Sequence, residues 1–397
     1  MSVREIAPKI YSISVIDWNA RHFHGHTYST KRGTSYNAYL ILDEKVTLID
    51  TAHGSFSAEF LESVKKIIPL EKIDLVIANH VETDHSGSLP ALLEHCPKAK
   101  VLGDAKCKAG LEKYYHGKWD FQVVKTGEKL SIGKRTLTFI EVPMIHWPDS
   151  MLTYLIEDAI LFSNDAFGQH YAASERFDDE VDNHVLMEEA GKYFANILWP
   201  FSHLITAKLA EIEKLGIPIK IIATAHGISW RKDPGQIISA YKRWAANKTK
   251  PRIVVAYETM WGSTEKMARK IVEGIIDAGV SVRLYDLAQT DRTEVIYDMF
   301  EAKGYLFGTS NHDSGILPNM ASFTEFVKGL KPKNRIGGVF GSYGWSGISI
   351  KHMEAFLKDA GIQQAIPSLA IQYAPDVTEL SRCYDFGKQF AELVTKG

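Results

Sequence analysis

Cysteine is scarce in this chain of 397 residues, which has three cysteines and no Cys-x-x-Cys pair. Cys96, Cys107 and Cys383 lie far apart and cannot supply the ligands of an iron–sulfur cluster or of a four-cysteine zinc or iron site. We expect them to be ordinary buried thiols. The chain therefore carries no rubredoxin-type metal module of its own.

Long apolar segments and an excess of one charge are also missing. No segment approaches the roughly 20 apolar residues of a membrane-spanning helix, and the N-terminus lacks the apolar core of a signal peptide, so we expect a cytoplasmic protein. The formal net charge of −2 gives no electrostatic reason to expect nucleic acid or an anionic membrane as a partner. The content of 45% hydrophobic and 24% charged residues is typical of a soluble globular protein, with length enough for two domains.

One short stretch is rich in side chains that bind metals. Four of them directly follow an apolar, β-branched run at 73–78: His80, Glu82, Asp84 and His85. A strand that ends there would deliver all four to one rim. Along an extended tail, His80, Glu82 and Asp84 would share one side, and His85 would reach the same point only if the serine and glycine after it bend the chain.

Three later strand-like runs end near further candidate ligands. The run 136–142 precedes His146, 159–162 precedes Asp165, and 220–224 precedes His226. Together with the first stretch they give four histidines and three carboxylates. This set is too large for one tetrahedral zinc ion and suits two metals that share a bridging carboxylate.

The order of the elements predicts two sheets between helices for the first part of the chain. Strands are expected at 9–15, 35–42 and 46–49, and helices at 58–68, 90–95 and 184–198. The histidines of the loop 18–26 lie either near the metals or at the surface, and for each of them we favour the surface. The acidic run 177–182 is expected to be a solvated face or a helix N-terminal turn. A polar stretch at 246–251 then predicts a boundary between a domain 1–249 and a domain 250–397.

The second part begins with a buried strand at 252–257, a hydroxyl-rich loop at 258–264 and an amphipathic helix at 265–278. Backbone N–H groups, hydroxyls and the helix dipole converge on an anion in such a loop. The loop has no Lys or Arg and no Gly-x-x-x-x-Gly-Lys spacing, which argues against a nucleoside triphosphate.

Two more strands, 305–308 and 338–341, run into loops that suit a flat ring, with small residues for its edge and Tyr343 and Trp345 for its face. The three junctions predict a bound flavin. The candidate flavin-binding residues are Thr259, Met260, Trp261, Gly262, Ser263, Thr264, Ser310, Asn311, His312, Asp313, Gly315, Ser342, Tyr343, Gly344, Trp345, Ser346 and Gly347.

These motifs resemble, over essentially the full length, those of the flavodiiron proteins, or A-type flavoproteins. The family includes rubredoxin:oxygen oxidoreductases, nitric oxide reductases and oxidases of reduced coenzyme F420. The motifs are His80-x-Glu82-x-Asp84-His85, His146-Trp147-Pro148-Asp149-Ser150-Met151, Ser163-Asn164-Asp165-x-Phe167-Gly168-Gln169, His226-Gly227, Thr259-Met260-Trp261-x-Ser263-Thr264 and Gly341-Ser342-Tyr343-Gly344-Trp345-Ser346-Gly347. The resemblance implies an α/β protein, with a metallo-β-lactamase-like αββα sandwich followed by a flavodoxin-like, doubly wound parallel sheet.

The resemblance also implies the metal ligands, the cofactors and the activity. One iron would be bound by His80, Glu82 and His146, the other by Asp84, His85 and His226, with Asp165 bridging the two. The family's histidine at the position of His85 does not always bind metal. An FMN would relay electrons to this non-haem diiron site, where dioxygen is reduced to water or nitric oxide to nitrous oxide. The expected assembly is a head-to-tail homodimer, or a dimer of such dimers, with rubredoxin or another external donor such as reduced coenzyme F420.

The chain departs from the family pattern in two places. Asn311 and Asp313 stand where Thr and Asn are common, and a carboxylate near the ring would disfavour the anionic reduced flavin. Tyr193 and Phe194 stand where several relatives have two tyrosines, so one hydroxyl near the metals is expected to be missing.

Three other functions stay open at this point. The first is an enzyme of the same family that oxidises reduced coenzyme F420 directly. The second is a zinc hydrolase with an appended flavodoxin, and the third is an electron carrier whose first domain only docks a partner. The sequence does not decide between dioxygen and nitric oxide, because that preference depends on the surroundings of identical ligands.

Overall fold

The structure, a computed structural model, describes residues 2–396 and divides into two compact units. The first unit holds the chain up to residue 193 and residues 203–245, and the second holds 194–202 and the chain from 246 onward. The short segment 194–202 therefore packs with the second unit, although the first unit surrounds it in the sequence. The limits of the predicted domains, 1–249 and 250–397, stay a prediction.

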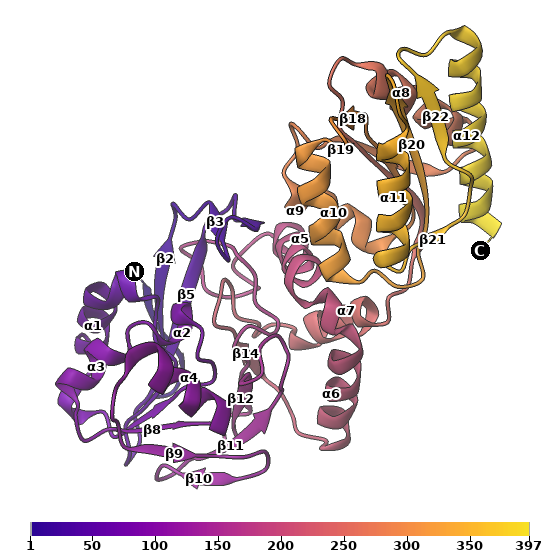
Figure 1. Cartoon of the computed structure of the whole chain (residues 1–397). Helices are drawn as coiled ribbons and strands as arrows, with labels where there is room; N and C mark the ends of the chain where they lie inside the picture. The colour runs from indigo at the N-terminus through magenta and orange to yellow at the C-terminus, as the bar shows by residue number, and fades with distance from the viewer. Residues whose placement is uncertain (1, 397) are drawn as a thin grey trace. The chain divides into compact units, whose positions relative to one another are not determined.

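Two sheets form the centre of the first unit (Figure 1). The first sheet has the order β1 (Ser2–Ala7), β2 (Ile10–Asp17), β5 (Thr34–Ile41), β6 (Thr47–Ile49), β7 (Leu75–Ile77), β8 (Lys100–Gly103), β9 (Phe121–Val123). The second has the order β10 (Lys129–Ser131), β11 (Thr136–Glu141), β12 (Met151–Leu155), β13 (Ile160–Phe162), β14 (Ile221–Ala223). The strands β6 to β9 are parallel, as are β13 and β14, and all other pairs in these sheets are antiparallel.

Alternation along β5 shows how the layers pack. Ala38 and Leu40 point into a core shared with the helices α1 (Ser57–Lys65), α3 (Leu89–His95) and α4 (Ala105–Tyr115). Tyr39 and Ile41 point the other way, into a core shared with the second sheet. The helices α5 (Asn183–Tyr193), α6 (Ser202–Lys214) and α7 (Pro234–Ala245) complete the unit, and Leu152 of β12 lines one small cavity together with residues of α6. The predicted αββα sandwich is confirmed.

The second unit is a parallel sheet with helices on both faces. The order is β16 (Ser281–Asp286), β15 (Lys250–Tyr257), β17 (Ala302–Gly308), β20 (Ile336–Tyr343), β21 (Gln363–Gln364), and β22 (Leu369–Gln372) also pairs with β20. Leu306 of β17 faces α8 (Ser263–Asp277) and α12 (Val377–Lys396), while the neighbouring Phe307 packs against Phe323 of α10 (Pro318–Leu330) and Phe356 of α11 (Ile348–Asp359). The doubly wound fold predicted from the sequence is confirmed.

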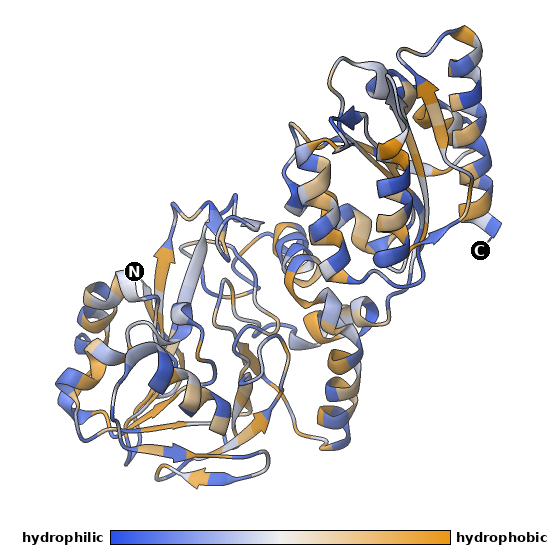
Figure 2. Cartoon of the chain, in the orientation of Figure 1, coloured by the Kyte–Doolittle hydropathy of each residue, from blue (hydrophilic) through white to orange (hydrophobic). Residues whose placement is uncertain are grey.

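Short elements and one close contact complete the fold. The short elements are β3 (His22–Phe23), β4 (Tyr28–Ser29), β18 (Asn311–His312), β19 (Gly315–Ile316) and the single turns η1 (Gly54–Phe56), η2 (Leu70–Lys72) and η4 (Trp199–Phe201). The helix α9 (Arg292–Glu301) belongs to the second unit. The helices α8 and α12 touch at Gly387, where a Cβ would lie 2.0 Å from the carbonyl oxygen of Ile271. Figure 2 shows most strands coloured as hydrophobic, while the helices alternate hydrophilic and hydrophobic residues.

Several expectations about local structure can be compared with the fold. The three cysteines are free and buried, as expected. The helix predicted at 184–198 is correct as far as Tyr193, after which the π-helical turn η3 (Phe194–Leu198) follows. In the acidic run, Asp182 accepts hydrogen bonds from the N–H groups of residues 184 and 185 at the start of α5, as expected of a helix N-terminal turn. No helix within residues 2–396 combines the length and apolar character required to cross a bilayer.

Candidate metal centre and flavin cavity

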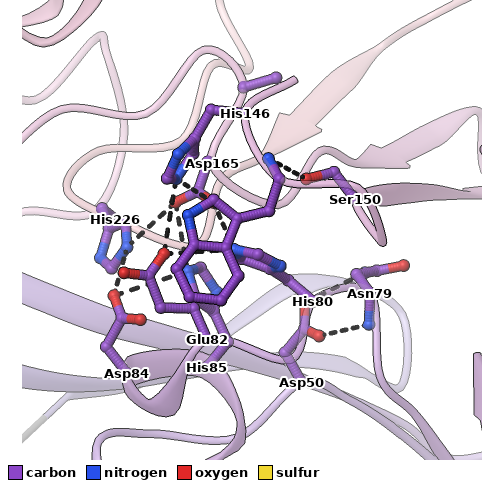
Figure 3. Close-up of polar contacts among 12 residues, drawn as sticks. Asp50, Asn79, His80, Glu82, Asp84, His85, His146, Ser150, Asp165 and His226 are labelled. Atoms are coloured by element: carbon purple, nitrogen blue, oxygen red, sulfur yellow. Dashed lines mark hydrogen bonds and ion pairs between the residues drawn. The ribbon is translucent and has the colours of Figure 1, made fainter. Parts of the chain in front are cut away.

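The loop after β7 is held in place by buried hydrogen bonds (Figure 3). Asp50, at the end of β6, accepts hydrogen bonds from the backbone N–H of Asn79 at 2.8 Å and from its side-chain amide at 3.0 Å. The Asn79 amide oxygen in turn accepts a 2.7 Å hydrogen bond from the hydroxyl of Thr153 on the second sheet. Both sheets therefore fix the start of the loop that carries the first candidate ligands.

The extended tail expected for residues 80–84 is wrong, because residues Thr83–Ser86 form a helical turn, α2. The chain bends at Glu82, before the pair of Asp84 and His85 rather than after it. The hydroxyl of Ser86 donates a 2.6 Å hydrogen bond to the carbonyl of Val81 and thereby closes the turn. This local hydrogen bond, which hydrophobic periodicity does not reveal, allows His85 to point toward the same centre as the other ligands.

All seven candidate ligands converge in two groups around Asp165 (Figure 3). In the first group, Glu82 Oε2 lies 3.2 Å from His80 Nε2 and 3.5 Å from His146 Nε2, and Asp165 Oδ2 lies 3.6 Å from each of these nitrogens.

The second group uses the other oxygen of Asp165. Asp165 Oδ1 lies 3.2 Å from His85 Nε2 and 3.3 Å from His226 Nε2. Asp84 Oδ2 is 3.1 Å from His226 Nε2 and 3.5 Å from His85 Nε2. The two oxygens of Asp165 are thus divided between two groups of ligand atoms.

Two histidines of the centre are oriented by hydrogen bonds at their far nitrogens. His80 Nδ1 donates to Asp149 Oδ2 at 3.0 Å, and the same oxygen accepts a 2.7 Å hydrogen bond from the backbone N–H of Val81. His226 Nδ1 donates to the carbonyl oxygen of Ser35 at 2.8 Å. Because an oxygen acceptor requires the proton on Nδ1, the lone pair of Nε2 points into the centre in both rings.

The centre carries buried polar atoms that have no hydrogen-bond partner. They are both carboxylate oxygens of Asp84, Oδ2 of Asp165, and Nε2 of His85, His146 and His226. A buried polar atom without a partner costs about 1–3 kcal/mol, so six of them in one place call for cations. Imidazole and carboxylate donors without thiolate suit iron, and the residues fit two such ions.

Electrostatics within the centre are dominated by its carboxylates. Burial disfavours a charge on the imidazole of His226, but its contacts with Asp165 and Asp84 outweigh burial and raise its pKa to about 10. Burial opposes contacts with Asp165 and Glu82 in the same way at His146, where the pKa rises to about 9. The centre therefore attracts positive charge, and metal ions would displace these protons on binding.

Two further side chains reach the centre: Tyr193, which the resemblance placed near the metals without naming a partner for its hydroxyl, and His24, which was expected at the surface. The hydroxyl of Tyr193 donates a 2.9 Å hydrogen bond to Asp165 Oδ1, and burial raises its pKa well above the usual value. His24 Nε2 lies 3.4 Å from Glu82 Oε1, so the expected surface position is wrong for this histidine, whereas His22 and His26 are exposed. Phe194 packs against the ring of Phe300 in the second unit.

A cavity of about 510 Å³ lies at the carboxyl ends of β15, β17 and β20 in the second unit. It is lined by ten of the predicted flavin-binding residues: Thr259, Met260, Trp261, Ser263, Ser310, Asn311, Ser342, Tyr343, Gly344 and Trp345. Two more lining residues, Tyr373 and Ala374, follow β22 and were missed, because a short strand with no glycine-rich loop after it gives no signal. The predicted residues outside the lining are Gly262, Thr264, His312, Asp313, Gly315, Ser346 and Gly347.

Some of the residues outside the lining shape the cavity instead. The Thr264 hydroxyl lies 3.0 Å from the hydroxyl of Ser342, which joins the first and third loops. Asn311 binds the backbone carbonyl of Ser346 through its side-chain amide, which joins the second and third loops. The side chain of Asp313, in contrast, is 91% exposed, so the expected effect of this carboxylate on the flavin has no support in the geometry.

Comparisons with known proteins agree with the folds of both units. The model of the ODP family beta lactamase matches residues 34–227, and that of the flavodoxins matches residues 255–387. The chain is 48% identical to a nitric oxide reductase of Moorella thermoacetica over 391 residues, which cover 98% of each chain.

Solved structures extend the agreement to three dimensions. The rubredoxin oxygen:oxidoreductase of Desulfovibrio gigas matches with a TM-score of 0.97 and 35% identity, covering 100% of this chain and 99% of that one. The flavodiiron protein of Giardia intestinalis matches with a TM-score of 0.95 and 34% identity, covering 100% and 97%. By sequence and structure over its whole length, this chain belongs to the flavodiiron protein family.

Proposed function

We propose that this protein is an oxidoreductase that reduces nitric oxide to nitrous oxide and water, or dioxygen to water, at a non-haem diiron centre that receives electrons through FMN. The observation that carries the proposal is the division of Asp165 between two groups of buried ligands, in which six polar atoms have no hydrogen-bond partner. One oxygen of Asp165 faces each group. A bridging carboxylate holds two metal ions at a fixed separation, which a reaction that needs electrons from both ions requires.

The proposed ligands follow from the two groups. His80, Glu82 and His146 would bind one iron, and Asp84, His85 and His226 the other. Three carboxylates, counting the bridge, offset three of the four positive charges of a diferrous pair and favour oxidation of the metals. The unpartnered Nε2 of His85 supports this histidine as a ligand.

The protein around the ligands orients and shields them. The irons would supply the redox chemistry, and the chain supplies the geometry: Asp149 and the carbonyl of Ser35 fix the tautomers of two histidines, and Tyr193 holds one oxygen of the bridge. The indole of Trp147 packs edge-on against His80 and helps to exclude water. The side chain of Glu82 is 15% exposed while that of Asp165 is only 2% exposed, so the centre is most open at Glu82.

We propose that the cavity of the second unit binds FMN. The loop before α8 would bind the phosphate, since the helix N-terminus and hydroxyl groups such as that of Ser263 meet there. Trp261 and Trp345 are 89% and 75% exposed beside the cavity, which is unusual for tryptophan and suits a site that a flat ring covers.

The partners remain proposals as well. Within the described residues the chain has no cysteine-bound metal module, so an external electron donor, rubredoxin or another, is required. Exposed aromatic side chains beside the flavin cavity favour a homodimer in which the flavin of one subunit serves the irons of its partner, alone or as a dimer of dimers. A cytoplasmic location also stays a prediction.

Neither alternative enzyme is favoured. The relatives named above are oxidoreductases by name. Direct oxidation of reduced coenzyme F420 has no specific observation in its favour either.

The test combines metal analysis with anaerobic stopped-flow of the reduced protein against each gas in turn. We expect two irons per chain and rapid reoxidation of the flavin by at least one gas. Asp165→Ala should abolish gas consumption, while Asp158→Ala, at the far end of the second sheet, should not. Zinc in place of iron, or a gas reaction that survives Asp165→Ala, would overturn the proposal in favour of a hydrolase or an electron carrier.

A further inference from the structure

A small apolar cavity of about 30 Å³ lies between α6 and the second sheet of the first unit. One wall is formed by Ile205, Leu209 and Ile212, which share one face of α6 at helical spacing. Leu152 of β12 lies on the opposite side. This cavity is part of neither the metal centre nor the flavin cavity.

Two other lining residues are next to proposed metal ligands in the sequence. Ile145 precedes His146, and Ala166 follows the bridging Asp165. The cavity therefore borders the backbone of one ligand from the first group and of the residue shared by both groups. Tyr241 of α7 also lines the cavity, and its hydroxyl is bonded to the backbone of Phe167, two residues after Asp165.

The polar groups around the cavity are already bonded. The hydroxyl of Tyr241 accepts a 2.7 Å hydrogen bond from the backbone N–H of Phe167, and the carbonyl of Phe167 accepts a 3.0 Å hydrogen bond from the indole of Trp230. The ammonium of Lys208 is 2.7 Å from Glu211, so only the aliphatic part of Lys208 is left to face the cavity. The lining is therefore apolar and offers a water molecule few hydrogen-bond partners.

The backbone of Phe167, one of the lining residues, is held in an unusual conformation. Phe167 has a left-handed backbone with φ of 67°, a conformation that is unfavourable for a large side chain. The two hydrogen bonds to its N–H and carbonyl hold it there, with its ring 4.5 Å from that of Tyr241. A cavity of about 30 Å³ exceeds the roughly 10–15 Å³ that one water-sized particle occupies and has room for a diatomic molecule.

We infer that this cavity binds a small apolar gas. It would hold nitric oxide or dioxygen beside the diiron centre before the gas reacts there. The inference rests on the proposed function and adds a route for the substrate. Protons would enter by the more open side at Glu82 and electrons would arrive through the FMN, while the gas partitions into the apolar space.

Xenon under pressure is the probe, because it is apolar, of similar size and visible in crystals. In crystals of the iron-loaded protein we expect xenon between Ile205 and Phe167. Ile205→Phe fills the cavity and should remove the xenon and lower kcat/KM for the gas by roughly tenfold, with iron content and the rate of flavin reduction unchanged. Ala207→Phe adds the same ring on the exposed face of α6 and should behave as the wild type.

Each result decides the inference. Absence of xenon from the cavity, or an unchanged kcat/KM for both gases when a crystal structure shows the ring of the Ile205→Phe variant inside it, would overturn it. If that variant does not fold, Ile212→Phe, at a half-buried position, takes its place. A wild-type protein that reduces neither gas would instead overturn the proposed function, so the two failures can be told apart.

Discussion

Replacing Asp149 by asparagine should weaken one of the two metal sites and spare the other. Asp149 Oδ2 accepts hydrogen bonds from His80 Nδ1 and from the backbone N–H of Val81, and the side chain is 4% exposed. Asparagine keeps the shape and one acceptor but removes the charge that both bonds use. Hydrogen bonds to charged groups contribute about 1.5–3 kcal/mol, and loss of such support lowers metal affinity by roughly 10- to 100-fold. We expect a loss of about 1.4–2.8 kcal/mol at the iron bound by His80.

The assay is a chelator competition that follows the loss of each iron separately. In Asp149→Asn the iron bound by His80 should leave first, and the iron bound by His226 should keep its affinity, because Ser35 supports that histidine independently. Asp158→Asn is the matched control, since Asp158 pairs with Arg135 in the turn between β12 and β13, at the opposite end of these strands. Equal loss of both irons, or none, would refute the assignment of Asp149 to one site.

Three further predictions address stability and the flavin. Removing iron with a chelator leaves the buried ligands without partners, so calorimetry should show a lower Tm for the first unit and an unchanged one for the second; a uniform shift would contradict this. Gly387→Ala should destabilise the protein to urea by about 1–3 kcal/mol because the new Cβ meets Ile271, whereas Gly329→Ala, in open space on α10, should stabilise it by about 0.5–1 kcal/mol. Trp345→Ala should weaken FMN binding by roughly tenfold in a fluorescence titration, while Trp18→Ala, exposed in the first unit, should not; equal affinities would remove Trp345 from the flavin site.

The sequence was sufficient for the architecture and for the residues that gather at the centre. Buried strands with ligands at their ends have a clear pattern, because parallel strands bring their carboxyl ends to one edge. The sequence was insufficient to predict the backbone conformation where one local interaction determines it. The turn at Thr83–Ser86 depends on a side-chain hydrogen bond from Ser86, and an alternation rule predicts an extended chain there.

Contacts between segments that are distant in the sequence could not be predicted from it either. Tyr193 lies in a helix whose periodicity predicts burial but not the partner of its hydroxyl, and His24 lies in a polar loop that looks like surface. Tyr373 lines the flavin cavity from a loop with no recognisable motif. In each case the tertiary fold, rather than a local pattern, brings the side chain to the site.

The most direct test of the central claim is anomalous diffraction at the iron absorption edge from crystals of the protein prepared with iron. The account predicts two peaks per chain, one among His80, Glu82 and His146 and one among Asp84, His85 and His226, with Asp165 between them. A single peak, or two peaks whose absorption edge is that of zinc, would contradict it.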